Sequence, residues 1–179
     1  AFYDIKVDAP QARRIFKLNL EACLRAIGDS LALHSVCLMN EPTSEFWEKD
    51  QFRLALWRRY LERRHHTIRE VNELEGTNYK SFVEVPVHST RTMPPEEEMS
   101  PLRYDQVRFN MDRFAEFHRF LSEVIHKERP GTLTHTKTMA MLERDALHYG
   151  TDPDQFAYVG DLNGNDTWNK FVGEGDRYA

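Results

Sequence analysis

The segment LHSVCLMNEP, residues 33–42, decides the fold of this chain. Five of the seven residues at 33–39 are apolar, which is typical of a parallel strand that is covered on both faces. The run stops at Asn40, Glu41 and Pro42, because a proline cannot donate to the ladder of backbone hydrogen bonds. The sequence therefore predicts a parallel strand with an amide and a carboxylate at its carboxyl end.

The segments on either side of this strand have the periodicity of helices. Upstream, apolar residues recur at helical spacing until Gly28 ends the pattern. Downstream, Thr67-Ile68-Arg69-Glu70 is a capping box, and a later apolar stripe is typical of a long helix. We expect helices at residues 10–27, 46–65, from 68 and 102–128, and strands at 33–39, 132–140 and 156–162, with a short helix between the last two strands. A surface loop is expected at 85–101 and a turn at 163–165.

Strands that are separated by helices predict an α/β fold built from parallel βα units. Two architectures fit the order of elements: part of a (β/α)8 TIM barrel, or an open doubly wound sheet. No glycine-rich phosphate loop follows an expected strand, which argues against a nucleotide-binding sheet. The sequence contains no internal repeat and no domain boundary, so we expect residues 1–179 to form a single domain.

Composition and charge argue against several classes of protein. Of the 179 residues, 40% are hydrophobic and 30% are charged, as in folded domains. The net charge of -5 argues against a nucleic-acid partner, and the basic run at residues 58–66 is interpreted as a solvated helix face. The sequence has no apolar run long enough to span a membrane and no signal-peptide pattern, which favours a cytoplasmic protein. Cys23 and Cys37 have no metal-type spacing and are expected to be small buried residues.

Glu41 is expected at the carboxyl end of a strand, which is where barrel enzymes carry their chemistry. An apolar barrel wall beside its carboxyl group would raise the pKa of Glu41, as a general acid working near neutral pH requires. The amide of Asn40 can donate to a sugar hydroxyl. The alternative is an ordinary turn that ends the strand, and the tripeptide Asn-Glu-Pro alone does not decide between the two.

Four segments of the chain resemble glycoside hydrolases, in matching order. LHSVCLMNEP is similar to the fourth barrel strand of clan A glycoside hydrolases, in which Asn-Glu carries the general acid/base. WRRYLERRHHTIREVNELEGTNYKSFVEVP, residues 57–86, resembles the segment after that strand in family 42 β-galactosidases. RFNMDRFAEFHRFLSEVIHKERPG, residues 108–131, and DLNGNDTW, residues 161–168, resemble the helix before the fifth strand and the end of the sixth strand.

The resemblance implies that the chain holds about strands four to six of a TIM barrel. It implies a retaining, two-carboxylate hydrolysis of β-galactosides or related β-glycosides, with Glu41 as general acid/base and Asn40 on the 2-hydroxyl of the sugar. Tyr79 lies near a position where the family has an aromatic residue lining the sugar site. The nucleophile belongs to the seventh strand in clan A, so further copies of the chain, or the remainder of a longer barrel chain, would supply it. The third alternative is a damaged relative without activity. This chemistry needs a carbohydrate substrate and neither a metal nor an organic cofactor.

Two residues near the expected sixth strand, Asp166 and Trp168, are further candidates for contact with a sugar. Trp168 would either stack on a sugar ring or pack under the barrel rim. The spacing from Asp161 to Val172 superficially matches a calcium loop, but Asp166 stands where such a loop needs glycine, so we expect no metal site.

His135 and Lys137 alternate with threonines at 132–140, so they are expected to share one face of that strand as a polar layer below the site. A Schiff-base role for Lys137 has no other support in the sequence. The alternative function, from a different class, is a non-catalytic carbohydrate-binding or assembly module on the same scaffold.

Overall fold

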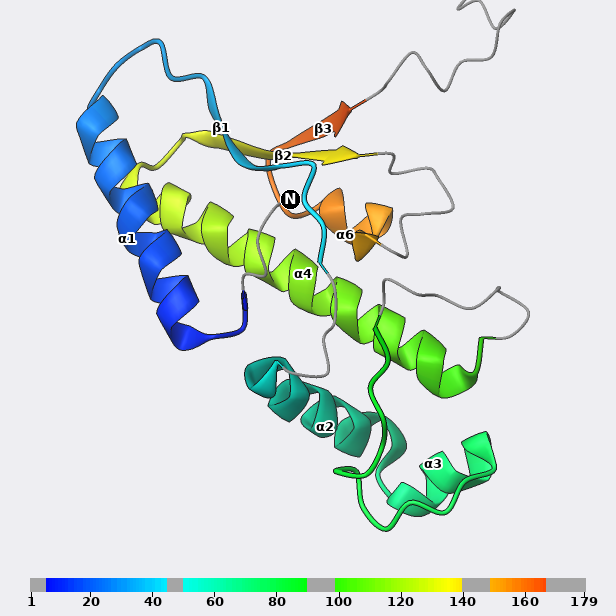
Figure 1. The fold of residues 1–179 in the computed structure, drawn as a ribbon. Coiled ribbons are helices and arrows are strands. Elements are labelled where there is room, and N and C mark those ends of the chain that lie inside the picture. The colour runs from blue at the N-terminus through cyan, green and yellow to red at the C-terminus, as the bar shows by residue number, and fades with distance from the viewer. Residues whose placement is uncertain (1–5, 45–49, 90–98, 140–148, 167–179) are drawn as a thin grey trace, which may run out of the picture.

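The computed structural model describes residues 6–44, 50–89, 99–139 and 149–166 (Figure 1). The elements are α1 (Pro10–Ile27), β1 (Ser35–Asn40), α2 (Gln51–His65), α3 (Ile68–Glu75), α4 (Pro101–Glu128), β2 (Leu133–Met139), α6 (Pro153–Phe156) and β3 (Leu162–Asp166). Their order, helix, strand, two helices, long helix, strand, short helix and strand, is the predicted order.

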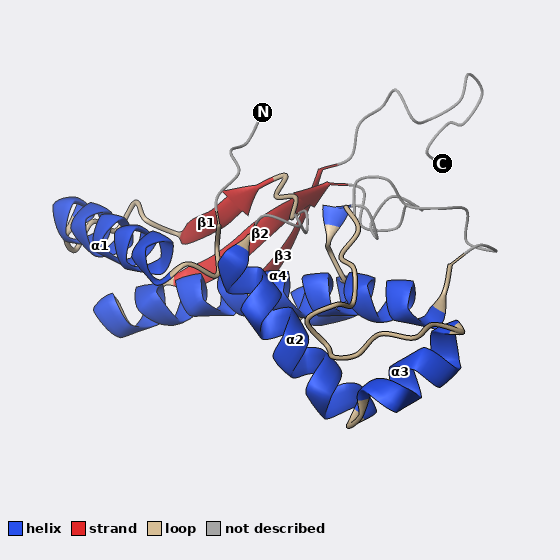
Figure 2. Cartoon of the chain, turned by 60° about the horizontal axis from the view of Figure 1, so that its bottom comes forward, coloured by secondary structure: helices blue, strands red, loops and turns tan. Residues whose placement is uncertain are grey.

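The three strands form one parallel sheet in the order β1-β2-β3. The helices α1, α4 and α6 lie on the same side of this sheet (Figure 1), and the turned view of Figure 2 shows the same for α1 and α4. Consecutive strands are therefore neighbours, and the described helices cover one face only, as in the wall of a (β/α) barrel. The predicted α/β fold with parallel strands is confirmed.

The strand β2 presents alternate residues to the helices. Thr134 is fully buried, and its Oγ1 lies 2.8 Å from Ser122 Oγ on α4. The other threonines of this face, Thr132, Thr136 and Thr138, are buried as well. Because side chains alternate along a strand, His135 and Lys137 project from the opposite face, as the sequence predicts.

The helix α4 is the centre of the hydrophobic core. Phe117 and Leu121 pack against α1 and β1, and the Phe117 ring meets Phe16 edge-on at 5.2 Å between ring centroids. Nearer its amino end, Phe109 joins a second cluster that contains Trp57 of α2 and Val71 of α3. One helix therefore supports both the sheet and the pair α2 and α3.

A buried carboxylate joins the segment before α1 to two helices. Asp8 accepts hydrogen bonds from Arg53 Nε of α2 at 2.8 Å and from Arg113 Nη2 of α4 at 2.7 Å. Burial raises the pKa of Asp8, but the two guanidinium groups outweigh that effect and hold the pKa below its ordinary value.

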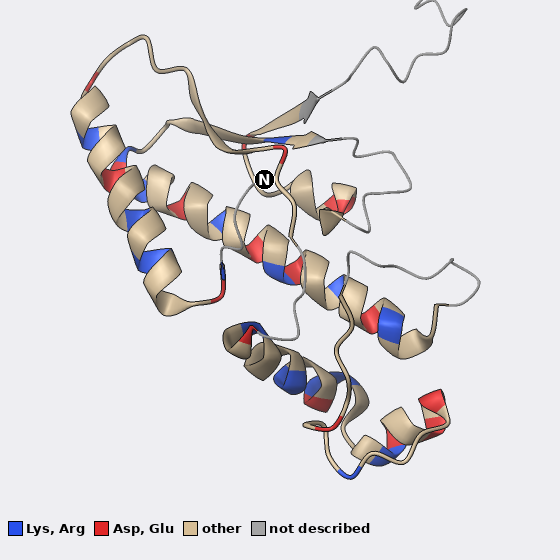
Figure 3. Ribbon diagram, viewed as in Figure 1, with Lys and Arg blue, Asp and Glu red and all other residues tan. Residues whose placement is uncertain are grey.

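Charges of both signs are interspersed along α1 and α4 (Figure 3). Within the predicted basic run, Arg59, Arg63 and Arg64 are exposed, which agrees with the prediction of a solvated face. Among the described residues, none of the helices has the length and apolar character needed to cross a membrane.

The prediction for the end of the chain is wrong. Residues 156–162 are not a strand: Pro153–Phe156 is the short helix α6, and β3 begins at Leu162. Asp152 caps α6 by accepting from Asp154 N, and Pro153 opens the helix.

The predicted turn at residues 163–165 is wrong as well, because these residues belong to β3. A Cβ on Gly164 would lie 2.9 Å from the Thr136 carbonyl oxygen. The glycine is therefore needed for close approach of two strands, and not for a turn.

Two further predictions need correction. The described part of α2 begins at Gln51, where Asp50 caps it by accepting from Phe52 N and Arg53 N, and residues 46–49 of the predicted helix lie outside the described residues. Cys23 and Cys37 are exposed and not buried. Cys23 lies on the outer side of α1, and Cys37 lies on the face of the sheet that the described helices leave uncovered.

We predict that His118 makes folding stability depend on acid pH. Its side chain is fully buried on α4, Nδ1 donates to the Phe114 carbonyl, and burial lowers the pKa of His118 from 6.5 to about 4. The unfolded chain therefore takes up this proton at a higher pH than the folded chain. The contribution of neutral His118 is complete above pH 6.5 and is lost as the pH falls to about 4, a change of about 3 kcal/mol.

Urea unfolding at a series of pH values measures this dependence. His118→Phe keeps a buried aromatic ring but removes the titrating group, so the slope between pH 6.5 and 4 should become shallower. The exposed His66 offers a control, since His66→Gln should keep the wild-type slope. An unaltered slope in His118→Phe would refute the prediction.

Candidate functional site

The carboxyl ends of three parallel strands meet at one edge of the sheet. Asn40 of β1 pairs in register with Lys137 of β2, and Met139 of β2 pairs with Asp166 of β3. This edge is where enzymes with parallel βα units carry their binding and catalytic groups. The candidate site is therefore the strand-end edge formed by these residues and by Glu41.

A bulge in β1 sets the direction of Asn40. The register of β1 on β2 shifts between Cys37 and Asn40. Leu38 and Met39, which follow one another in the chain, both pack against the buried cluster of α4, whereas Cys37 and Asn40 are exposed. The extra residue thus brings Asn40 to the face opposite the helices, on the side of Lys137.

Glu41 has a backbone conformation that is uncommon for its residue type. Its φ is 46°, in the left-handed region, and its side chain is half-buried. Its backbone N–H donates to the Lys137 carbonyl at 2.7 Å, so the pairing of β1 with β2 continues through Glu41. A left-handed conformation costs an L-residue about 1–2 kcal/mol. Such strain is concentrated at functional sites, which makes Glu41 the first candidate for chemistry.

The other predicted site residues do not all lie at the strand-end edge. Asp166 is the last residue of β3, so its backbone lies on the strand-end edge. Trp168 lies outside the described residues. Tyr79 packs against the cluster of Trp57 and Phe109, and its backbone N–H and carbonyl both bind the Asn72 side chain. The structure thus brings Asn40, Glu41 and the end of β3 to one edge of the sheet. Tyr79 instead packs among the helices α2, α3 and α4.

Asp161 lies at the opposite edge of the sheet from Glu41. It precedes β3, and its Oδ2 accepts from Thr134 N at 2.7 Å and from His126 Nε2 at 3.0 Å. The Thr134 N–H is the main reason that the pKa of Asp161 lies below its ordinary value. This carboxylate aligns the start of β3 with β2 and is held away from the strand-end edge.

Sequence reasoning missed Asn110, a polar residue that supports the site. It lies on α4 within the apolar stripe, between Val107 and Phe114, and it is only 1% exposed. Its amide contacts the loop that follows Glu41. The available signal was a single asparagine on the buried face of a helix, because such a group needs hydrogen-bonding partners.

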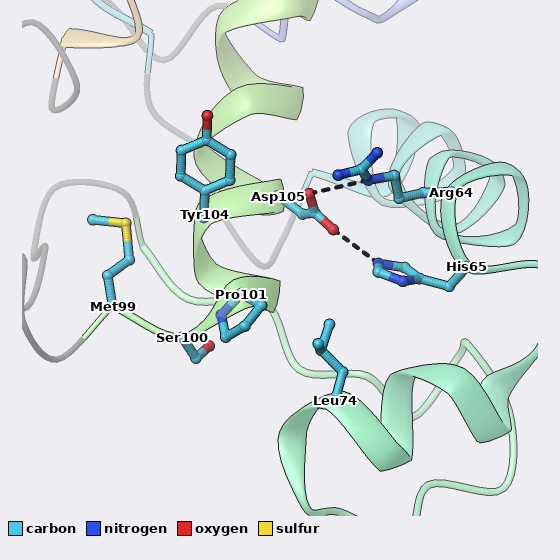
Figure 4. Close-up of a pocket in the computed structure, with 8 residues that line it drawn as sticks. All are labelled: Arg64, His65, Leu74, Met99, Ser100, Pro101, Tyr104 and Asp105. Carbon is cyan, nitrogen blue, oxygen red and sulfur yellow. Dashed lines mark hydrogen bonds and ion pairs between the residues drawn. The ribbon is translucent and has the colours of Figure 1, made fainter.

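A separate pocket lies among α2, α3 and α4 (Figure 4). Asp105 accepts there from His65 Nε2 at 2.8 Å, and Arg64 Nε lies 3.5 Å from its other oxygen. The remaining lining residues are Leu74, Met99, Ser100, Pro101 and Tyr104. The ionic groups of this pocket satisfy one another, and none of its lining residues belongs to a strand end. Within the described ranges, no three His, Cys, Asp or Glu side chains are grouped so as to hold a metal ion.

Comparison with known proteins connects this geometry to a family. The family model Glyco_hydro_42, described as Beta-galactosidase, matches residues 14–177. No curated protein matches the chain.

Solved structures share the fold. An exo-carrageenase of family GH42 from Bacteroides ovatus, solved without ligand, superposes with a TM-score of 0.72 at 27% identity, covering 89% of this chain and 23% of that protein. A cold-adapted β-galactosidase from Rahnella sp. R3 gives a TM-score of 0.70 at 18% identity, covering 90% and 23%. A β-galactosidase from Bacillus circulans sp. alkalophilus gives 0.68 at 15% identity, covering 90% and 24%. The chain thus spans about a quarter of the length of these proteins.

We predict that Glu41→Gly is more stable than Glu41→Ala by about 1 kcal/mol, because glycine adopts a positive φ without a steric penalty. Both variants lose the carboxylate, so the comparison isolates the backbone. Thr43, in the same loop and outside the set of residues with positive φ, is the control. There, alanine should be the more stable substitution by about 0.4–1 kcal/mol. Urea unfolding measures the stability of all four variants. Equal stability of the two Glu41 variants would contradict the prediction that the backbone at Glu41 is strained.

Proposed function

Because the chain belongs to the Glyco_hydro_42 family of β-galactosidases, we propose that it forms strands four to six of the catalytic barrel of a glycoside hydrolase. The observation that carries this proposal is the position of Glu41, which follows Asn40 at the carboxyl end of β1 in a left-handed backbone conformation. The substrates would be β-galactosides or related β-glycosides.

Glu41 would act as general acid and then as general base in a retaining mechanism. In the first step it donates its proton to the glycosidic oxygen while the nucleophile bonds to the anomeric carbon and the leaving alcohol departs. In the second step the Glu41 carboxylate takes a proton from water, which attacks the anomeric carbon and releases the nucleophile. Support for this role comes from the half-buried side chain and from the backbone hydrogen bond to Lys137, which fixes Glu41 beside β2.

Asn40 would bind the 2-hydroxyl of the sugar that is cleaved. Its exposed side chain lies on the face of the sheet opposite the helices, which in a barrel is the interior. A hydrogen bond to the 2-hydroxyl strengthens as positive charge develops on the sugar ring, so this contact contributes to the rate. Lys137 pairs in register with Asn40, and the backbone of Asp166 ends β3 at the same edge, so both residues would be further contacts to the sugar.

The second carboxylate has to stand about 5–5.5 Å from Glu41 in a retaining enzyme. We assign it neither to Asp161, which lies at the far edge, nor to Asp166. The nucleophile would come from a seventh barrel strand, in the remainder of a longer chain or in another copy of this one. The active form is accordingly the one in which the remaining strands are present.

The exo-carrageenase shares 27% of aligned residues with this chain, whereas the two β-galactosidases share 18% and 15%. Carrageenan oligosaccharides therefore belong with simple β-galactosides in any substrate screen. A carbohydrate-binding module on the same scaffold is the second candidate, because the described residues supply three parallel strands and one candidate catalytic carboxylate.

We predict that Glu41→Gln lowers kcat by about 10²–10⁴-fold in the active form, because the amide can neither donate an acidic proton nor act as a base. The fold should persist, since glutamine has the same shape as glutamate. Hydrolysis of an aryl β-galactoside measures the loss, and circular dichroism confirms the fold.

Asp161→Asn is the matched control, because it removes one carboxylate from the opposite edge of the sheet. It should retain kcat within about threefold, well below the effect of losing a general acid. Unchanged turnover in Glu41→Gln would remove Glu41 from the mechanism. Sugar binding without turnover in the wild-type protein would instead favour the binding module.

A further inference from the structure

The loop that follows Glu41 is held by a buried amide of α4. Asn110 Nδ2 donates to the Ser44 carbonyl at 2.9 Å, and Ser44 N donates to the Tyr149 carbonyl at 2.9 Å. Ser44 is 7% exposed and Asn110 is 1% exposed, so water does not compete for these bonds. The backbone three residues after Glu41 is therefore fixed from two sides.

The orientation of the Asn110 amide is itself determined. Arg53 Nη1 donates to Asn110 Oδ1 at 2.8 Å and to Ser44 Oγ at 3.0 Å, while Arg53 Nε donates to Asp8 at 2.8 Å. Because the cation of Arg53 occupies the oxygen of the amide, the nitrogen must point to the Ser44 carbonyl. The Asp8 carboxylate in turn holds Arg53 in place.

The backbone at Gly150 lies directly against the hydrogen bond between Asn110 and Ser44. A Cβ there would lie 2.7 Å from Asn110 Nδ2 and 2.8 Å from the Ser44 carbonyl oxygen. A glycine with φ of 71° therefore lies against the bond between Asn110 and Ser44 and keeps it enclosed.

The two ends of the segment 41–44 are thus tied to different elements. At one end, Glu41 N donates to the Lys137 carbonyl of β2 at 2.7 Å. At the other end, Asn110 of α4 holds the Ser44 carbonyl. A left-handed glutamate persists only where its surroundings over-determine the backbone, and these two attachments provide that constraint.

We propose that Asn110 is a positioning residue for Glu41: through the Ser44 carbonyl it fixes the backbone from which the Glu41 carboxyl group reaches the glycosidic oxygen. This inference rests on the proposed function of Glu41 as general acid. A small displacement of a general acid impairs proton transfer more than it impairs sugar binding.

The test uses two aryl β-galactosides in the active form of the enzyme. Phenoxide is a poor leaving group that needs a proton from Glu41, whereas 2,4-dinitrophenoxide leaves without one. Asn110→Ala should lower kcat/KM for phenyl β-galactoside by about tenfold or more, and for the 2,4-dinitrophenyl substrate by less than about threefold. A merely structural role would lower both values by the same factor.

Gln106 is a matched control on the same helix. It is also 1% exposed, and its amide also binds the backbone of a loop, because Nε2 donates to the His88 carbonyl and Oε1 accepts from His88 N. Gln106→Ala should produce a comparable fall in melting temperature with equal effects on the two substrates. If Asn110→Ala shows the same ratio of effects as Gln106→Ala, the positioning role is refuted.

Two more variants distinguish failure of the inference about Asn110 from failure of the proposed function of Glu41. Asn110→Asp keeps an oxygen beside Arg53 but places another against the Ser44 carbonyl, so it should reproduce the selective loss even if Asn110→Ala does not fold. Glu41→Gln should show a stronger dependence on the leaving group than either. If Glu41→Gln shows this dependence and the Asn110 variants do not, only the inference about Asn110 fails. If Glu41→Gln does not show it, the proposed function fails and the inference about Asn110 fails with it.

Discussion

The buried carboxylate of Asp8 joins the segments on which the site depends. It binds Arg53 of α2 and Arg113 of α4. Arg53, held in this way, also donates hydrogen bonds to Asn110 and Ser44. Moving these charges out of water is costly, and only good geometry on every partner offsets the cost. Loss of one partner would leave an uncompensated buried charge, at a cost of about 3–5 kcal/mol. These buried charges therefore restrict the loop after β1 to a narrow range of conformations.

The sheet complements this network, because its two faces are used differently. The threonines of β2 are buried on the side of α4, where Thr134 forms a hydrogen bond with Ser122. Cys37 and Asn40, on the other face, remain exposed beside the register positions of His135 and Lys137. In a closed barrel this face is the interior, where polar residues near the carboxyl ends meet the substrate. Whether a strand residue is buried or exposed thus depends on which face of the sheet the helices cover, and not on local propensity.

Local signals in the sequence predicted the helices well. Thr67 caps α3 as its capping box indicates, and Ser100 and Pro101 open α4 one residue before its predicted start. Two errors arose where a residue serves a distant partner. The Asn-Gly-Asn pattern predicts a turn at Gly164, although this glycine permits close approach to Thr136 of another strand. The role of Asn110 is not visible in the sequence, because its partner Ser44 is 66 positions away and a helical stripe gives no information about such a contact. The tripeptide at the strand end predicts Asn40 and Glu41 as site residues, but the bulge that sets the direction of Asn40 depends on pairing with β2.

The strain at Glu41 shows why this part of the chain needs so much support. A glycine at this position would adopt the left-handed backbone at no steric cost, yet it would carry no carboxyl group. A glutamate in a relaxed strand would keep the carboxyl group but would aim it elsewhere, because the side-chain direction follows the backbone. Acid catalysis at a fixed atom requires both the group and the direction, so the conformational cost has to be offset by contacts outside the strand. The hydrogen bonds from Asn110 and Arg53 to Ser44 are contacts of this kind. Both donors lie far from Glu41 in the sequence, so the support for the backbone after β1 comes from helices and not from the strand itself.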